Sequence, residues 1–168
     1  MIEFWKRKKL MSHHFSIVIL TIGIPGAGKT MWVRNYVKDH PTTFVVSTDE
    51  LRRELTGQEQ CVDPSQNDWI HDEAYKRVKE ILDDPANYKG LGPTVIVDST
   101  NTDMNEWVKY KHSGAGILLA KVFDVSVDEA MQHQMLRARK VPEQIVEMKW
   151  KQLQENKKFL PFFFNMLL

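Results

Sequence analysis

The chain has 168 residues, of which 42% are hydrophobic and 27% are charged, and this composition predicts a single globular domain with a sizeable core. Its formal net charge of +1 at pH 7 excludes a uniformly basic nucleic-acid binder. A single cysteine excludes an internal disulfide and favours a reducing, cytoplasmic setting, and no apolar run reaches the ~20 residues of a membrane span, so we expect no membrane contact.

Residues 1–15 are expected to be a mobile leader that precedes one domain over residues 16–168. Four basic residues stand against Glu3 in the first ten positions, which gives this segment a net charge of +3. The leader has no apolar core of the kind that a secretory signal needs. A basic arm that helps to hold nucleic acid is the alternative, because contact with a polyanion must come from a local patch in a nearly neutral chain.

A phosphate-binding loop follows the first apolar run. The run Ile17–Ile22 is typical of a buried strand, and the next residues read Gly-Ile-Pro-Gly-Ala-Gly-Lys-Thr. Glycines let the backbone N–H groups converge on phosphates, the lysine neutralises phosphate oxygens, and the hydroxyl can bind Mg²⁺. A helix expected over Thr30–Asp39 would face the same anion with its positive end. We therefore predict a site for ATP and Mg²⁺ formed by Gly23, Pro25, Gly26, Ala27, Gly28, Lys29 and Thr30.

The rest of the chain alternates apolar runs with helical patterns. Strands are expected over Thr43–Ser47, Thr94–Asp98 and Ile117–Phe123. Helices are expected over Asp49–Leu55, Trp69–Leu82, Met104–Lys111, Val127–Arg139 and Pro142–Asn156. This alternation predicts an α/β fold in which about four parallel strands are flanked by helices and ligands bind at the carboxyl ends of the strands, and the phosphate-binding loop makes it a P-loop fold. A C-terminal helical lid is expected over about residues 127–142.

An acidic and a basic side chain follow the second predicted strand. Thr48 or Asp49 would cap the next helix, and Asp49 and Arg52 would project from one face of it. Beside a γ-phosphate, this carboxylate can accept the proton of an attacking hydroxyl, and this arginine can clamp an acceptor phosphate or the transferring phosphoryl group. An ordinary cap with an ion pair gives the same pattern. We take Asp49, Arg52 and Lys29 as catalytic candidates.

Two further places carry charge that can serve the reaction. Asp98 ends the third predicted strand and can hold Mg²⁺ together with Thr30, pair with a lid arginine, or only cap the helix near Met104. Arg137 and Arg139 at the predicted lid can place positive charge on the transferring phosphoryl group. The sequence does not decide between these two arginines, and a solvated helix end would also favour them.

The segments around the phosphate-binding loop, Asp49, Asp98 and Arg137 resemble the kinase domain of phage-type 5′-polynucleotide kinases. The resemblance covers most of residues 17–157 and rests on Leu20–Arg34, Ser47–Arg52, Val97–Asn101, Val122–Val125 and Arg137–Pro142. It implies transfer of the γ-phosphoryl group of ATP to the 5′-hydroxyl end of RNA or DNA. We expect a single-stranded end as the acceptor, because a deep pocket cannot admit a terminus that is buried in a duplex. It also implies a role in nucleic acid end repair, in the cytoplasm of the host cell if a phage encodes the chain.

The same resemblance implies a role for each matching residue. Asp49 would be the general base for the 5′-hydroxyl, and Arg52 would hold the 3′-phosphate of the acceptor. Lys29 and Thr30 would serve ATP and Mg²⁺, and Arg137 would contact the phosphates of the donor.

The chain departs from the family pattern in three ways. Met31 follows Thr30 where the family often has a second hydroxyl residue, and the segment from Arg137 to Pro142 is about one residue shorter. The Asp-x-Asp-Gly-Thr motif of a 3′-phosphatase is absent, so we expect a kinase-only chain and leave open a separate ligase or phosphatase partner. The alternatives are a small-metabolite kinase of the gluconate, shikimate or adenylylsulfate type and a non-catalytic nucleotide-binding switch.

Apolar and aromatic side chains outside these motifs are expected to pack. Residues Phe159–Leu168 are too apolar to stay in water, so they either pack back on the sheet or form a homo-oligomer contact. Trp69, Trp107 and Trp150 lie in amphipathic helices, where packing in the core or between helices is expected rather than base stacking.

Overall fold

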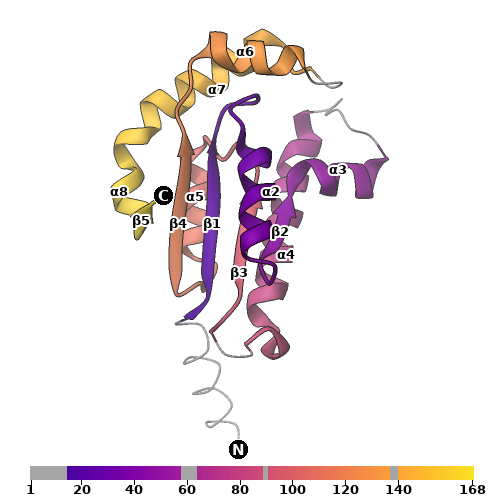
Figure 1. Ribbon diagram of the computed structural model, residues 1–168, viewed down its shortest axis with the longest axis vertical. Helices are drawn as coiled ribbons and strands as arrows, with labels where there is room; N and C mark the ends of the chain where they lie inside the picture. Colours follow the sequence, from indigo (N-terminus) through magenta and orange to yellow (C-terminus); the bar gives the residue numbers. More distant parts are fainter. Residues whose placement is uncertain (1–14, 58–63, 89–90, 137–139) are drawn as a thin grey trace, which may run out of the picture.

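The computed structural model describes residues 15–57, 64–88, 91–136 and 140–168. It has an α/β fold in which a five-stranded sheet is flanked by helices, and every pair of neighbouring strands is parallel (Figure 1). The order in the sheet is β2-β3-β1-β4-β5. The strands are β1 (Ile17–Gly23), β2 (Phe44–Ser47), β3 (Thr94–Asp98), β4 (Ile117–Phe123) and β5 (Met166–Leu167). The expected α/β fold is confirmed, and the fifth strand is an addition to it.

Helices connect the strands in the alternation that the sequence predicts. They are α2 (Lys29–Asp39), α3 (Thr48–Thr56), α4 (Pro64–Asp83), α5 (Met104–Lys111), α6 (Val127–Met135), α7 (Glu143–Asn156) and α8 (Leu160–Phe163), with single 3₁₀ turns at Pro85–Asn87 and Lys157–Phe159. Helix α4 begins five residues before the expected start at Trp69. The reason is Pro64, which is compatible with the first turn of a helix because no intrahelical N–H bond is needed there.

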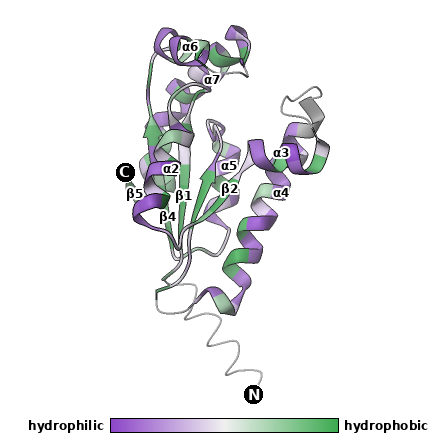
Figure 2. Ribbon diagram, turned by 45° about the vertical axis from the view of Figure 1, so that its right-hand side comes forward, coloured by the Kyte–Doolittle hydropathy of each residue, from purple (hydrophilic) through white to green (hydrophobic). Residues whose placement is uncertain are grey.

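The sheet is buried between two layers of helices. Ile19 and Ile96 point to one face, where they pack against Val33 of α2. Neighbouring strand residues such as Leu20 point to the opposite face, where Trp107 of α5 is fully buried. Figure 2 shows the same arrangement, with hydrophobic residues concentrated in the strands and hydrophilic ones on the outer sides of the helices. This packing aligns the carboxyl ends of the strands at one edge.

The apolar C-terminal segment packs back on the sheet, which is one of the two outcomes that the sequence left open. The Asn165 N–H donates to the Leu118 carbonyl, and the Leu118 N–H donates to Asn165 Oδ1, both at 2.8 Å. The ring of Phe164 contacts Trp107 with 5.7 Å between ring centroids. Phe162 remains 71% exposed, so only part of the segment joins the core.

The predicted packing of the tryptophans is correct for two of the three. Trp107 is fully buried, and Trp150 packs against a second apolar cluster that includes Val146. Trp69 is 47% exposed on α4, so it does not lie in the core, whereas the next residue, Ile70, is fully buried.

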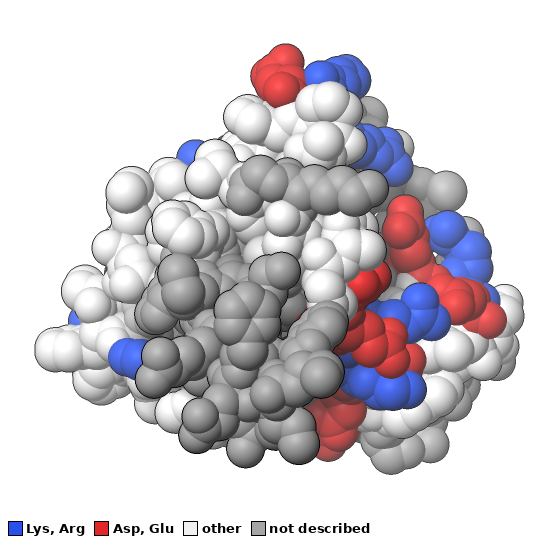
Figure 3. All heavy atoms as spheres, turned by 90° about the horizontal axis from the view of Figure 1, so that it is seen from below, with Lys and Arg blue, Asp and Glu red and all other residues white. Residues whose placement is uncertain are grey.

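Acidic and basic side chains alternate on the described surface. In Figure 3, Lys and Arg lie beside Asp and Glu on the side where α3 and α4 are found in Figure 1. Arg77 of α4, for example, is 2.9 Å from the Glu54 carboxylate. Residues 1–14 of the expected leader lie outside the described residues. Among the helices that are described, none has the length and hydropathy to cross a membrane.

Candidate active site

The loop between β1 and α2 has the backbone conformation of a phosphate cradle. Gly26 and Gly28 have φ angles of 91° and 90°, which L-residues with a side chain rarely adopt. A Cβ atom at Gly26 would also lie 2.3 Å from the Ala130 carbonyl oxygen of α6. Gly28 is the N-cap of α2 and provides no side-chain cap. The N–H groups in the first turn of the helix can therefore donate hydrogen bonds to a phosphate.

Lys29 lies against the beginning of this loop. Its Nζ donates hydrogen bonds to the carbonyl oxygens of Gly23 and Ile24 at 2.9 and 2.8 Å, and the residue is only 8% exposed. The partners are neutral, so a phosphate oxygen would be a stronger acceptor for the ammonium group. The lysine is thus placed to exchange carbonyl partners for phosphate oxygens.

Thr30 and Asp98 meet beside Lys29. The Asp98 carboxylate is 7% exposed, accepts a hydrogen bond from the Thr30 side chain, and is close enough to Lys29 to feel its charge. Burial raises the pKa of Asp98, and the Thr30 hydrogen bond and the Lys29 charge oppose this effect. Nearby Asp49 raises it further.

This pair of residues fits Mg²⁺. The described residues contain no group of three or more His, Cys, Asp or Glu side chains that could hold a metal by themselves. Mg²⁺ needs only one or two protein oxygen ligands when phosphates and water complete its shell. A hydroxyl hydrogen-bonded to a buried carboxylate next to the phosphate cradle offers this donor set.

Buried hydrogen bonds join the ends of the three strands that surround the cradle. Thr21 Oγ1 donates to the Ser99 carbonyl at 3.0 Å, and Asn101 Nδ2 donates to the Thr21 carbonyl at 2.9 Å. Thr48 Oγ1 donates to Ser99 Oγ at 3.1 Å. The sequence analysis did not predict this network, although Thr21 is a polar residue within an apolar run. These bonds fix β1, β2 and β3 relative to one another at the edge where chemistry can occur.

Asp49 and Arg52 form an ion pair at the start of α3. Ser47 caps this helix by accepting a hydrogen bond from the Glu50 N–H at 3.4 Å, so the expected cap by Thr48 or Asp49 is wrong. Because Asp49 is not the cap, its carboxylate is directed elsewhere: Arg52 Nη1 donates to Asp49 Oδ1 at 2.8 Å. The Asp49 side chain is 61% exposed, whereas that of Arg52 is 6% exposed.

Asn67 is a third member of this group that sequence reasoning missed. Its Oδ1 accepts a hydrogen bond from Arg52 Nη2 at 3.1 Å. The residue lies on the part of α4 that the sequence did not predict as helical, between Pro64 and Trp69. No sequence pattern distinguishes a polar residue in the first turns of a helix that contacts a distant arginine from one that does not.

The phosphate-binding loop and the ion pair of Asp49 and Arg52 lie at the same edge of the sheet. One strand, β3, separates β2 from β1, so their ends are about 10 Å apart. The charges of Lys29 and Asp49 both act on Asp98, which lies between them. In Figure 1, the loop after β1 lies below helix α6 at the upper end of the molecule, and α3 lies lower, to the right of α2. The predicted Arg137 and Arg139 lie outside the described residues.

Helix α6 of the expected lid packs directly on the phosphate-binding loop. His133 Nδ1 is 2.9 Å from the Gly26 carbonyl oxygen, to which it must donate, and Ala130 packs against Ile24 and Ala27. Gln134 Oε1 accepts a hydrogen bond from the Val141 N–H at 2.8 Å, which ties the end of α6 to the residues before α7. A displacement of α6 would therefore act on the loop itself.

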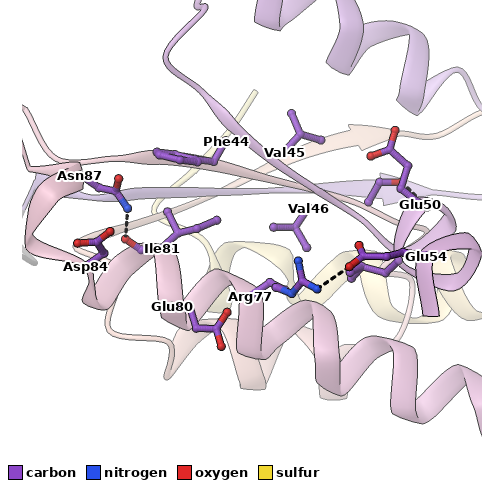
Figure 4. A pocket seen from close by; sticks show the side chains of 12 residues that line it. Phe44, Val45, Val46, Glu50, Glu54, Arg77, Glu80, Ile81, Asp84 and Asn87 are labelled. Carbon is purple, nitrogen blue, oxygen red and sulfur yellow. Dashed lines mark hydrogen bonds and ion pairs between the residues drawn. The ribbon is translucent and has the colours of Figure 1, made fainter.

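A cavity of about 430 Å³ lies beside this site, between β2, α3 and α4. Figure 4 shows an apolar floor that includes Val46 and Ile81, and a rim that carries Glu50 and Glu80. The only basic side chain among its lining residues, Arg77, is paired with a glutamate of the same rim. The cavity is not formed by the phosphate-binding loop, and its acidic rim repels a polyanion.

Solved structures with the same fold include a chain of the Pnkp1/Rnl/Hen1 RNA repair complex. That chain is 24% identical, with a TM-score of 0.72, over 87% of this chain and 46% of its own length. A gluconokinase from Sinorhizobium meliloti 1021 is 13% identical, with a TM-score of 0.60, over 86% of this chain and 78% of its own. A shikimate kinase from Acinetobacter baumannii in complex with shikimate is 14% identical, with a TM-score of 0.56, over 95% and 86%. The present chain thus spans less than half the length of the RNA repair chain.

The family comparison agrees with this fold. The sequence model described as an AAA domain, AAA_33, matches residues 18–160, from β1 to the first residue of α8. The matched region contains the phosphate-binding loop, both predicted carboxylates and the helices α6 and α7. The chain belongs to the AAA_33 family of AAA domains and has the P-loop kinase fold.

Proposed function

We propose that this chain transfers the γ-phosphoryl group of ATP to the 5′-hydroxyl end of a polynucleotide. The observation that carries the proposal is the Asp49 carboxylate, which is 61% exposed and is held by buried Arg52 at the end of β2. An exposed carboxylate beside a phosphate cradle is suited to accept a proton from an incoming hydroxyl. A nucleotide-binding protein that only switches conformation would not need this pair.

The donor side would act through the loop and its lysine. The loop N–H groups and Lys29 would hold the β- and γ-phosphates in place. Thr30 and Asp98 would hold Mg²⁺, which supplies positive charge that offsets the charge on the phosphate oxygens. Arg137 or Arg139 remains the proposed source of further positive charge from the lid.

The acceptor side would act through Asp49. The attacking hydroxyl oxygen forms a bond to the γ-phosphorus while the bond from that phosphorus to the bridging oxygen of ADP breaks. The hydroxyl proton passes to the Asp49 carboxylate, and ADP leaves with the electron pair of the broken bond. Arg52 keeps the carboxylate in place at 2.8 Å.

Two lines of support favour a polynucleotide acceptor. The segments around Asp49, Asp98 and the loop resemble phage-type 5′-polynucleotide kinases, and a chain with the same fold belongs to an RNA repair complex. A separate ligase or phosphatase partner would fit such a setting. The second candidate is a small-metabolite kinase, because a gluconokinase and a shikimate kinase share the fold over most of this chain.

The substitution Asp49→Asn tests the proposal. Transfer from radiolabelled ATP to a 5′-hydroxyl oligonucleotide is measured beside gluconate and shikimate as acceptors. We expect the oligonucleotide to be labelled, and Asp49→Asn to lower kcat by at least ~100-fold with little change in the KM for ATP. Asp39→Asn, an exposed carboxylate at the end of α2, is the matched control.

Three outcomes would contradict the proposal in different ways. Labelling of a metabolite but not of the oligonucleotide would assign the chain to the metabolite kinases. Unchanged kcat in Asp49→Asn would remove the general base. Binding of ATP without transfer to any hydroxyl would support the nucleotide-binding switch.

A further inference from the structure

We infer that Asn67 is a positioning residue for phosphoryl transfer, because it holds the Arg52 guanidinium in the orientation that fixes the general base Asp49. This inference rests on the proposed function and adds a residue from α4 to it. The three side chains form one chain of contacts: Asn67 Oδ1 accepts from Arg52 Nη2 at 3.1 Å, and Arg52 Nη1 donates to Asp49 Oδ1 at 2.8 Å.

The Arg52 side chain depends on these partners for its direction. It is 6% exposed, and its Nε is buried without a hydrogen-bond partner in the described part of the chain. A buried guanidinium needs hydrogen bonds with other protein groups, because water does not reach it to supply them. Asn67 supplies one such bond from a different helix, so it selects the orientation of the guanidinium plane.

The two helices are held together where this contact is made. Leu51, which precedes Arg52, and Ile70, one turn after Asn67, are both buried in the same apolar cluster. The distance between Arg52 and Asn67 is therefore set by packing between α3 and α4. Because Asn67 is held in place by this packing, its hydrogen bond restricts the orientation of the Arg52 guanidinium.

The orientation of the Asp49 side chain depends on the hydrogen bond from Arg52. Its side chain is 61% exposed in the first turn of α3, where packing alone would leave several rotamers open. A hydrogen bond from a buried, oriented arginine favours one of them. Proton transfer to a positioned carboxylate is faster than to one that must first rotate into place.

Positioning and acceptor binding by Arg52 predict different kinetics. The resemblance implies that Arg52 holds the 3′-phosphate of the acceptor, so its loss would raise the KM of acceptors that carry this phosphate. If Arg52 instead acts on Asp49 under the control of Asn67, loss of Asn67 lowers kcat for every acceptor and leaves both KM values in place.

A double-mutant cycle on the full chain tests this inference. We expect Asn67→Ala to lower kcat roughly 10-fold for oligonucleotides with and without a 3′-phosphate, the size of one hydrogen bond to a charged group. In the Arg52→Ala background the same change should cost less than about 2-fold, because Asn67 then has nothing to orient. Asn67→Asp keeps an acceptor oxygen and should recover most of kcat. Asp68→Ala, an exposed neighbour on α4, is the control.

The outcomes that overturn the inference are distinct from failure of the proposed function. Losses that multiply in the double variant, or a rise in acceptor KM alone, would show that Asn67 does not act through Arg52 on Asp49. If wild-type protein does not label the oligonucleotide, the proposed function fails. The same cycle is then measured on slow hydrolysis of ATP by water, where Asp49 takes a proton from water, and coupling there would still support the role of Asn67.

Discussion

Asp98 is a charged residue in a place that disfavours its charge. It is 7% exposed, and burial raises its pKa, although the Thr30 hydrogen bond and the Lys29 charge oppose this effect. With a raised pKa, the folded protein binds the proton more tightly than the unfolded chain does. Its contribution to stability is therefore fully present below the unfolded pKa and is lost as the pH rises through the folded pKa.

Asp98→Asn is expected to make the protein more stable and less active. At pH 7 the neutral amide avoids the burial of a charge while its oxygen can still accept from Thr30, so Tm should rise. The gain should shrink as the pH is lowered toward the unfolded pKa of about 4, because a growing fraction of the wild-type carboxyl is then protonated. Thermal unfolding between these pH values measures it, and the Mg²⁺ dependence of transfer should weaken in parallel. A lower Tm at pH 7 would show that the charge stabilises the fold.

Helices α4 and α5 are joined by a network of charged side chains. His71 Nδ1 lies 3.4 Å from Glu106 Oε2, and Lys109 Nζ lies 3.3 Å from Glu106 Oε1 and 2.9 Å from Asp72 Oδ1. Burial would raise the pKa of Glu106, but the hydrogen bonds and charges of His71 and Lys109 outweigh burial and lower it. A lowered pKa gives stability that is present above the unfolded pKa and is lost as the pH falls through the folded one.

Glu106→Gln should therefore destabilise the protein in a pH-dependent way. We expect the free energy of unfolding at pH 7 to fall by about 1 to 3 kcal/mol, because the network loses a charged acceptor that is only 13% exposed. The difference from wild type should begin to shrink as the pH falls to the unfolded pKa of about 4.3, and it should disappear only below the lower pKa of the folded state. Urea unfolding over a series of pH values from 7 downward measures this change. Glu80→Gln, exposed on α4, should stay within ~0.5 kcal/mol of wild type, and an equal loss there would contradict the assignment.

At the scale of the whole molecule, the C-terminal segment completes the sheet. Strand β5 pairs with β4, and Phe164 is buried to 6% exposure against Trp107 of the helix layer. Residues far apart along the chain thus share one core. The expected homo-oligomer contact through this segment stays a prediction. Phe162, the most exposed aromatic residue of the segment at 71%, is the candidate for such a contact.

Phe164→Ala and Phe162→Ala separate core packing from surface exposure. The first should lower the free energy of unfolding by about 3 to 5 kcal/mol, the usual cost of emptying a buried phenylalanine site. The second should change it by less than ~0.5 kcal/mol. Denaturant unfolding of both variants checks this difference. Similar losses in the two would show that the segment is not anchored by Phe164. Sedimentation of Phe162→Ala beside wild type tests the oligomer contact.

Much of the fold was predictable because its signals are local. The run Ile17–Ile22 became β1 (Ile17–Gly23), and the glycine-rich residues that follow have the left-handed conformations that their type allows. Apolar runs and helical periodicity depend on neighbours within a few positions, so one sequence contains them. That Asp49 and the phosphate-binding loop follow strand ends at the same edge of the sheet was also predictable, since the carboxyl ends of parallel strands meet at one edge.

Patterns along the chain were sufficient to predict the alternation of strands and helices, the phosphate-binding loop and the carboxylates at the strand ends. Three features emerge only in the folded molecule: the hydrogen bond between Asn67 and Arg52, the close approach of Ala130 to Gly26, and the fifth strand near the end of the chain. Each of these contacts joins elements whose spacing is set by how helices pack on each other or on the sheet. Local residue patterns carry no information about that packing, because it depends on the shape of the whole core.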